Sequence, residues 1–187
     1  DNFTCRHTEA TTMKDLAPMQ NSKYVQSIVG DCYAKVKKRL EDGRYVLFTG
    51  TPCQIAALKS YLKKDYDSLL TMDVVCHGVP NQLFWKTYLR HSEKSNIQSY
   101  TFRNRANKRT WNPASRVPHR GTQEATIVAS WGTKHIPAQQ DAFYGPFVRC
   151  ESYRMSCYYC QYARKERVSD ITMGDCDSDK LYPSFYP

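Results

Sequence analysis

Two short apolar runs, each followed directly by a turn that carries a cysteine, constrain the fold of this chain most. Residues 45–48 precede the turn 50–53, and residues 69–75 precede the turn 76–80. Continuously apolar runs of this length are typical of strands in a parallel sheet that is covered on both faces. The segment 167–175 also resembles a strand that enters a turn, and residues 126–131 predict a further short strand.

Helical patterns alternate with these runs. Residues 25–40 place apolar side chains at three- and four-residue steps, with Cys32 on the apolar stripe as a core thiol and Gly43 just past the end. Residues 54–62 predict a second helix, which Thr51 caps and in which Pro52 suits the first position. A third runs from about residue 81 to 92, whereas residues 1–22 predict loop and turn. The alternation predicts an α/β fold with a parallel-sheet core built from β-α-β units.

The length of 187 residues fits one domain. We expect an α/β part over about residues 22–100 and an irregular, basic part rich in Cys and Tyr over residues 101–187. No stretch approaches the roughly 18 to 20 apolar residues of a membrane helix, and the polar start is not a signal peptide. We therefore expect a cytoplasmic protein without a membrane span. The chain begins with Asp1 rather than Met, which suggests that it was cut from something longer.

The positive charge is concentrated in one segment. The net charge is +9, and between Lys86 and Arg120 nine basic residues stand against one acid. Such a balance predicts an anionic partner. Four bases suit a diphosphate or an acidic tail: Arg103, Arg105, Lys108 and Arg109. Because aromatic residues lie among these bases, single-stranded nucleic acid is a weaker alternative; the aromatic residues are Tyr100, Phe102 and Trp111.

The cysteines carry the most specific chemistry. There are eight, an even number that leaves a disulfide framework as an alternative, although the length and the missing signal peptide argue against it. Cys53 lies at a helix N-terminus, where the helix dipole stabilises a thiolate. Cys76 lies where the next strand ends, so a β-α-β unit brings both to one sheet edge. The turn that carries Cys53 also suits a phosphate.

Cys157 and Cys160 form a Cys-x-x-Cys pair, which allows both sulfurs to face one metal. A thioredoxin-type redox pair has the same spacing and stays open. With Cys53 and Cys76 the pair provides four thiolates, which suit either zinc or an iron–sulfur cluster. Cys150 is a substitute ligand, and Cys5 and Cys176 receive no role.

Four motifs in the same order resemble the beta subunit of coenzyme F420 hydrogenase/dehydrogenase. The first begins Ser22-Lys23-Tyr24-Val25-Gln26-Ser27 and continues with Gly30-Asp31 and Val46-Leu47-Phe48-Thr49-Gly50-Thr51-Pro52-Cys53-Gln54. The others are Val75-Cys76-His77-Gly78-Val79-Pro80, Arg154-Met155-Ser156-Cys157-Tyr158-Tyr159-Cys160, and Arg167-Val168-Ser169-Asp170-Ile171-Thr172-Met173-Gly174-Asp175. The last departs from the family where Cys176 follows.

The resemblance implies an oxidoreductase subunit that is an iron–sulfur flavoprotein with FAD and a [4Fe-4S] cluster. Coenzyme F420 is a further candidate ligand, and the implied partner is a redox protein of the hydrogenase, formate dehydrogenase or ferredoxin type. The resemblance assigns the cluster to Cys53, Cys76, Cys157 and Cys160, and so favours iron over zinc. The flavin contacts it implies are Lys23, Tyr24, Gln26, Ser27, Thr51, Gln54 and Asp170. The alternative is a zinc-stabilised, non-catalytic binding module for an anionic partner.

Overall fold

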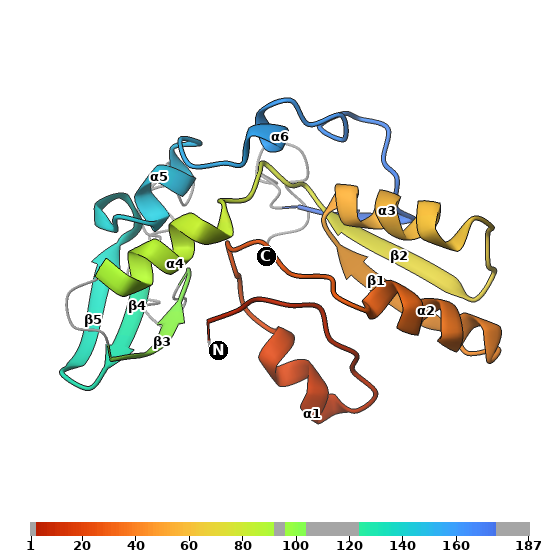
Figure 1. Cartoon of the computed structure of the whole chain (residues 1–187), viewed down its shortest axis with the longest axis horizontal. Helices are drawn as coiled ribbons and strands as arrows, with labels where there is room; N and C mark the ends of the chain where they lie inside the picture. Colours follow the sequence, from red (N-terminus) through yellow and green to blue (C-terminus); the bar gives the residue numbers. More distant parts are fainter. Residues whose placement is uncertain (1–2, 92–95, 104–123, 175–187) are drawn as a thin grey trace, which may run out of the picture. The chain divides into compact units, whose positions relative to one another are not determined.

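The computed structural model describes residues 3–91, 96–103 and 124–174, and the chain forms two compact units (Figure 1). Unit 1 comprises Asp1–Ile28 and Gly78–Tyr158, and unit 2 comprises Val29–His77 and Tyr159–Pro187. Each unit is therefore built from two separate stretches of chain. This division differs from the boundary expected near residue 100, and the single domain stays a prediction.

Unit 2 is the predicted α/β part. Its parallel sheet has the order β1-β2-β6, and α2 and α3 pack beside it (Figure 1). The elements are α2 (Cys32–Glu41), β1 (Val46–Gly50), α3 (Pro52–Leu62), β2 (Leu69–Val74) and β6 (Ile171–Met173). The prediction of an α/β fold with a β-α-β unit is thus confirmed, since α3 connects the parallel strands β1 and β2.

The helix expected over residues 25–40 begins only at Cys32. Residue Ile28 instead pairs with the N-terminal segment, since its N–H donates to the Cys5 carbonyl and its carbonyl accepts from His7, both at 2.9 Å. Gly30 then takes a positive φ of 58°, which turns the chain before α2. Cys32 is buried, as predicted, and Gly43 follows the helix with a φ of 75°.

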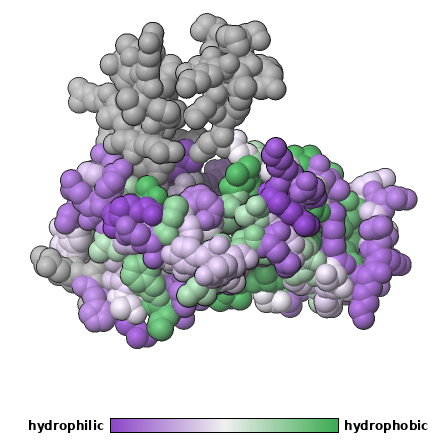
Figure 2. All heavy atoms as spheres, turned by 90° about the horizontal axis from the view of Figure 1, so that it is seen from above, coloured by the Kyte–Doolittle hydropathy of each residue, from purple (hydrophilic) through white to green (hydrophobic). Residues whose placement is uncertain are grey.

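One face of this sheet is covered by helices, whereas apolar side chains on the other face are partly exposed among the described residues. Phe48 of β1 packs with side chains of α2 and α3, and Thr71 and Asp73 of β2 point to the same face and are fully buried. On the opposite face five apolar side chains are 42% to 55% exposed: Leu47, Leu70, Val74, Ile171 and Met173. The expectation of a sheet covered on both faces is therefore wrong for the described residues. On the face of the molecule drawn in Figure 2, apolar and hydrophilic side chains are mixed.

Unit 1 is built around an antiparallel sheet of order β3-β4-β5. Its strands are β3 (Ile97–Thr101), β4 (Glu124–Ala129) and β5 (Gly132–Pro137), and its helices are α1 (Met13–Leu16), η1 (Ala17–Met19), α4 (Gln82–His91), η3 (Ala138–Gln140), α5 (Tyr144–Val148) and α6 (Met155–Tyr158). The strand expected over residues 126–131 corresponds to β4, while β3 and β5 were not predicted. The loop expected over residues 1–22 contains the short α1 and η1. Among the described residues, no helix combines the length and apolar character needed to cross a membrane.

The core of unit 1 is aromatic. Trp85 of α4 lies among the rings, with centroids 4.6 Å from Phe143 and 5.1 Å from Tyr100. Its indole N–H donates to the Phe3 carbonyl at 3.0 Å, so the polar atom is satisfied. Phe102 is buried in this core, where it serves packing and offers no surface for stacking a base. Trp111 lies outside the described residues.

A buried carboxylate organises one side of this core. Asp141 Oδ1 accepts from the N–H groups of Phe143 at 2.9 Å and Tyr144 at 2.7 Å, while Oδ2 accepts from the Tyr88 hydroxyl at 2.7 Å. Burial, followed by the interaction with Asp141, raises the pKa of Tyr88. Asp141 thus joins α4 to the start of α5.

We predict that Asp141→Ala destabilises unit 1 by at least about 2 kcal/mol, because it leaves three buried donors without an acceptor. Tyr88→Phe removes one donor and is expected to cost about 1 kcal/mol. All three tryptophans lie within Gly78–Tyr158, so urea unfolding followed by tryptophan fluorescence reports on this unit. Equal losses in the two variants would contradict the prediction.

Candidate functional site

The carboxyl ends of β1 and β2 lie at one edge of the unit 2 sheet. The strands are parallel, and Gly50 at the end of β1 is in register with Asp73 near the end of β2. Cys53 follows Gly50 on the first turn of α3, and Cys76 follows the end of β2. Both thiols therefore follow strand ends at the edge where open α/β sheets bind ligands.

The turn before α3 forms a capping box. The Thr51 carbonyl accepts from the Gln54 N–H at 2.9 Å, and Gln54 Oε1 accepts from the Thr51 N–H at 2.9 Å and from its hydroxyl at 3.1 Å. Cys53 Sγ lies 3.1 Å from the Thr51 hydroxyl and is exposed. The box holds Cys53 at the helix terminus, and the flavin contacts of Thr51 and Gln54 stay a prediction.

The same turn offers a phosphate fewer donors than the sequence suggested. The first helical residue, Pro52, has no N–H, and the Gln54 N–H is directed to Thr51. A helix N-terminus binds anions through such N–H groups. The capping box therefore favours a role for this turn in placing the Cys53 thiol over a role in binding phosphate.

The four candidate ligands are distributed over both units. Cys53, Cys76 and Cys160 belong to unit 2 and Cys157 to unit 1. All four are thiols, as are the other described cysteines, Cys5, Cys32 and Cys150. Within residues 3–91, 96–103 and 124–174, no three His, Cys, Asp or Glu side chains gather as a metal site. The donors are thiol sulfurs, which suit an iron–sulfur cluster in kind and number.

Asp170 is bonded to the central strand. Its Oδ2 accepts from the Thr71 hydroxyl at 2.6 Å and from the Thr71 N–H at 2.7 Å, and its own N–H donates back to Thr71. These bonds from Thr71 lower the pKa of Asp170 because they stabilise the ionised carboxylate. The bond from the hydroxyl has the largest effect, followed by the bond from the N–H. Asp170 thus attaches the segment before β6 to β2, and contact with a flavin stays a prediction.

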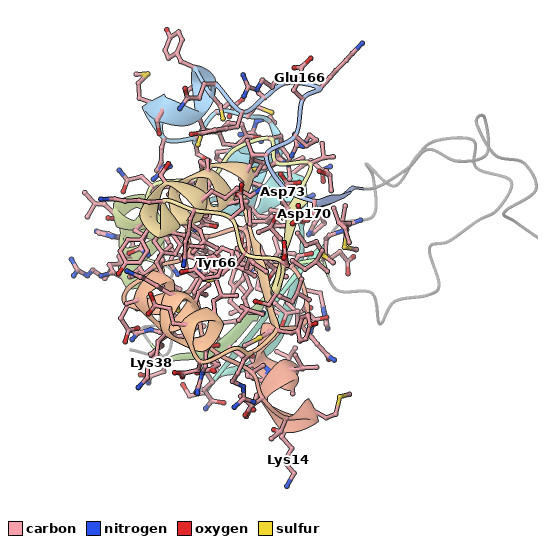
Figure 3. All side chains as sticks on the ribbon, turned by 90° about the vertical axis from the view of Figure 1, so that its right-hand side faces the viewer. Lys14, Lys38, Tyr66, Asp73, Glu166 and Asp170 are labelled. Atoms are coloured by element: carbon pink, nitrogen blue, oxygen red, sulfur yellow. The ribbon has the colours of Figure 1, made fainter. Side chains whose placement is uncertain are left out.

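An ion pair that the sequence analysis missed lies beside it. Arg167 Nη2 donates to Asp73 Oδ2 at 3.0 Å, and Asp73 is fully buried. Figure 3 labels Asp73 and Asp170 close together at the sheet. A carboxylate inside an apolar strand such as 69–75 needs a cation or several hydrogen-bond donors, so the position of Asp73 was the available signal.

The remaining predicted contacts lie in unit 1. The Lys23 ammonium donates to the Gln20 carbonyl, the Gln26 carbonyl accepts from Gln82 at 3.0 Å, and Ser27 Oγ lies 2.8 Å from His7 Nδ1. The Tyr24 ring stacks in the aromatic core, 4.7 Å from Phe147 between centroids.

Arg103 and Lys108 are the two basic candidates. Burial raises the pKa of Tyr144, and the neighbouring Tyr24 adds a smaller rise. The charge of Arg103 lowers the same pKa, so Arg103 lies close enough to Tyr144 to interact with it electrostatically. Arg103 therefore belongs to the same neighbourhood as Tyr24. Lys108 lies outside the described residues.

Comparison with known families identifies the chain. The family model for the C-terminal part of the coenzyme F420 hydrogenase/dehydrogenase beta subunit matches residues 43–184, well over half of the chain. The chain belongs to this family. Membership indicates a redox role of the beta-subunit type, within a complex of hydrogenase or dehydrogenase partners. No curated protein and no solved structure matches the chain significantly.

We predict that Asp170→Asn loosens β2 of this family member. Loss of the charge weakens both bonds from Thr71 by about 1 kcal/mol in total, which corresponds to about fivefold faster hydrogen exchange of the Thr71 amide. The folded pKa is lowered, so the stabilisation is present above the ordinary Asp pKa of about 3.9 and is lost as the pH falls through the folded value.

The difference between wild type and Asp170→Asn should therefore be largest above about pH 4 and shrink on acidification. Hydrogen exchange at several pH values checks this. Asp67→Asn, on the exposed turn before β2, is the matched control. A Thr71 amide that exchanges equally in both variants would contradict the prediction.

Proposed function

We propose that this chain is an iron–sulfur flavoprotein subunit that moves electrons between a hydride carrier of the deazaflavin type and a partner redox protein. Membership in the coenzyme F420 hydrogenase/dehydrogenase beta subunit family is the observation that carries the proposal. The thiols at the carboxyl edge of the unit 2 sheet support it. Conversion between two-electron and one-electron transfer is the chemistry that FAD and a [4Fe-4S] cluster supply when bound.

The residues of the chain would act by holding and placing these groups. Cys53, Cys76, Cys157 and Cys160 are the proposed iron ligands. The capping box fixes the position of the Cys53 backbone, and the pairing of β2 with β6 fixes the strand that leads to Cys76. Burial lowers the pKa of His77, the residue that follows Cys76.

FAD would be held by groups of opposite charge and by hydrogen bonds. Lys23 and Arg103 are the described cationic candidates for its diphosphate, since both lie in unit 1 near Tyr24. Gln26 and Ser27 add polar groups on the same segment. Coenzyme F420, itself an anionic carrier, is the proposed hydride donor or acceptor.

Anaerobic reconstitution with iron and sulfide, followed by quantification of iron, zinc and flavin, tests the cluster. We expect about four iron atoms per chain, with loss of most of this iron in Cys76→Ser and Cys160→Ser. Cys5→Ser is the matched control and should keep the iron. One zinc per chain without flavin would overturn the proposal in favour of the zinc-stabilised binding module.

Titration of the chain with FAD, read by quenching of flavin fluorescence, tests the flavin contacts. Lys23→Gln should weaken FAD binding about tenfold, the value of one hydrogen bond that involves a charged group. Lys38→Gln removes an equal charge from α2 and should change the affinity little. The same loss in both variants would mean that only net charge matters and would contradict a contact at Lys23.

A further inference from the structure

One side chain connects three parts of unit 2: β2, β6 and the segment at Arg164. Arg167 Nη2 donates to Asp73 Oδ2 at 3.0 Å and to the Val74 carbonyl at 3.1 Å. Its Nε donates to Thr172 Oγ1 at 3.1 Å, and its Nη1 donates to the Arg164 carbonyl at 3.4 Å. A planar guanidinium holds several acceptors in a fixed geometry, whereas a lysine ammonium does not.

These partners adjoin two of the three candidate ligand turns of unit 2, those of Cys76 and Cys160. Val74 ends β2 two residues before Cys76, and the intervening Val75 N–H donates to the Met173 carbonyl at 2.7 Å. On the other side, Arg164 directly follows a turn in which the Ala163 N–H donates to the Cys160 carbonyl at 3.1 Å. Arg167 thus links the turn that carries Cys160 to the strand end that leads to Cys76.

The Asp73 end of this link is buried, whereas the bonds from Arg167 to the Val74 and Arg164 carbonyls are exposed. Asp73 has no exposed surface, and its second oxygen, Oδ1, accepts no hydrogen bond from the described residues. Arg167 therefore compensates a charge that water does not reach, and a buried carboxylate of this kind does not tolerate the loss of its partner. Exposed ion pairs, such as that between Lys35 and Asp31, lack this constraint.

We infer that Arg167 is a positioning residue that fixes the Cys160 turn relative to the Cys76 strand end for thiolate binding of a metal. The inference rests on the proposed function, in which both cysteines are ligands. Groups that hydrogen-bond to the ligands themselves commonly change metal affinity 10- to 100-fold, and Arg167 acts one step further out, through the backbone beside the ligands.

Cadmium alone is a suitable probe, because it binds thiolates without redox chemistry and its sulfur-to-metal absorbance reports the bond. The metal-free full chain is titrated anaerobically with Cd²⁺ against a competing chelator. Arg167→Gln should lower the affinity about tenfold or more. Arg167→Lys keeps the positive charge but lacks the planar guanidinium, so its Cd²⁺ affinity should lie between those of Arg167→Gln and the wild type.

Two further variants separate positioning from stability. Thr71→Val removes two hydrogen bonds between β2 and Asp170, five residues before Cys76, and should keep the Cd²⁺ affinity within about twofold of wild type. Arg167→Gln with Asp73→Asn removes both charges of the pair and leaves no buried charge unpaired, so it is expected to fold even if Arg167→Gln alone does not. A loss of affinity in this double variant, with native circular dichroism, supports the inference.

Equal Cd²⁺ affinities in the double variant, Thr71→Val and the wild type would overturn the positioning role and leave the proposed function intact. A different result tests the proposed function itself. If Cys76→Ser and Cys160→Ser bind Cd²⁺ as tightly as the wild type, these thiols are not ligands, and both the proposed function and the inference fall.

Discussion

A buried negative charge on the central strand of unit 2 determines how that unit is closed. Asp73 faces the helix-covered side of the sheet, has no exposed surface there, and is paired with a cation. The cation is Arg167, 94 residues further along the chain. Bringing Arg167 to β2 also brings Asp170 to Thr71 and aligns Ile171–Met173 as the third strand. The pairing of β6 and the path of the Cys160 segment follow from this one ion pair.

Unit 1 uses a buried aspartate in another way. Asp141 is satisfied by three neutral donors, two of them backbone N–H groups at the start of α5, and the described residues give it no ion pair. Its interactions are local to the aromatic core, in which Trp85 and Phe143 pack. Asp73 instead joins distant parts of the sequence. Under the proposed function, the arrangement at Asp73 would keep the thiol ligands in place, because a charged pair has a strict geometry.

The α/β part was largely predictable because its signals are local. Thr51 and Pro52 mark the start of α3, and the apolar run 69–75 marks β2. The start of α2 was not predictable from the sequence. The apolar spacing continues from Val25 through a segment whose backbone pairs with the N-terminal segment instead of forming a helix. Strands β3 and β5 carry few apolar residues, and they form because β4 pairs with both. The bonds of Asp170 and Arg167 join residues more than 90 positions apart, which no local pattern encodes.

The order of the segments has a consequence for biosynthesis. The chain leaves unit 2 after His77 and returns only at Tyr159. A ribosome therefore completes β1, α3 and β2, and then all of the second stretch of unit 1, before the strand that pairs with the far side of β2 exists. During that interval Asp73 has not met Arg167 and the β2 edge is unpaired, which is a state prone to wrong strand pairing. The elements of unit 2 that are made first, including β1, α3 and β2, cannot complete their sheet until β6 has been synthesised. Unit 1 can pack its aromatic core before then, so the order of synthesis favours early folding of unit 1.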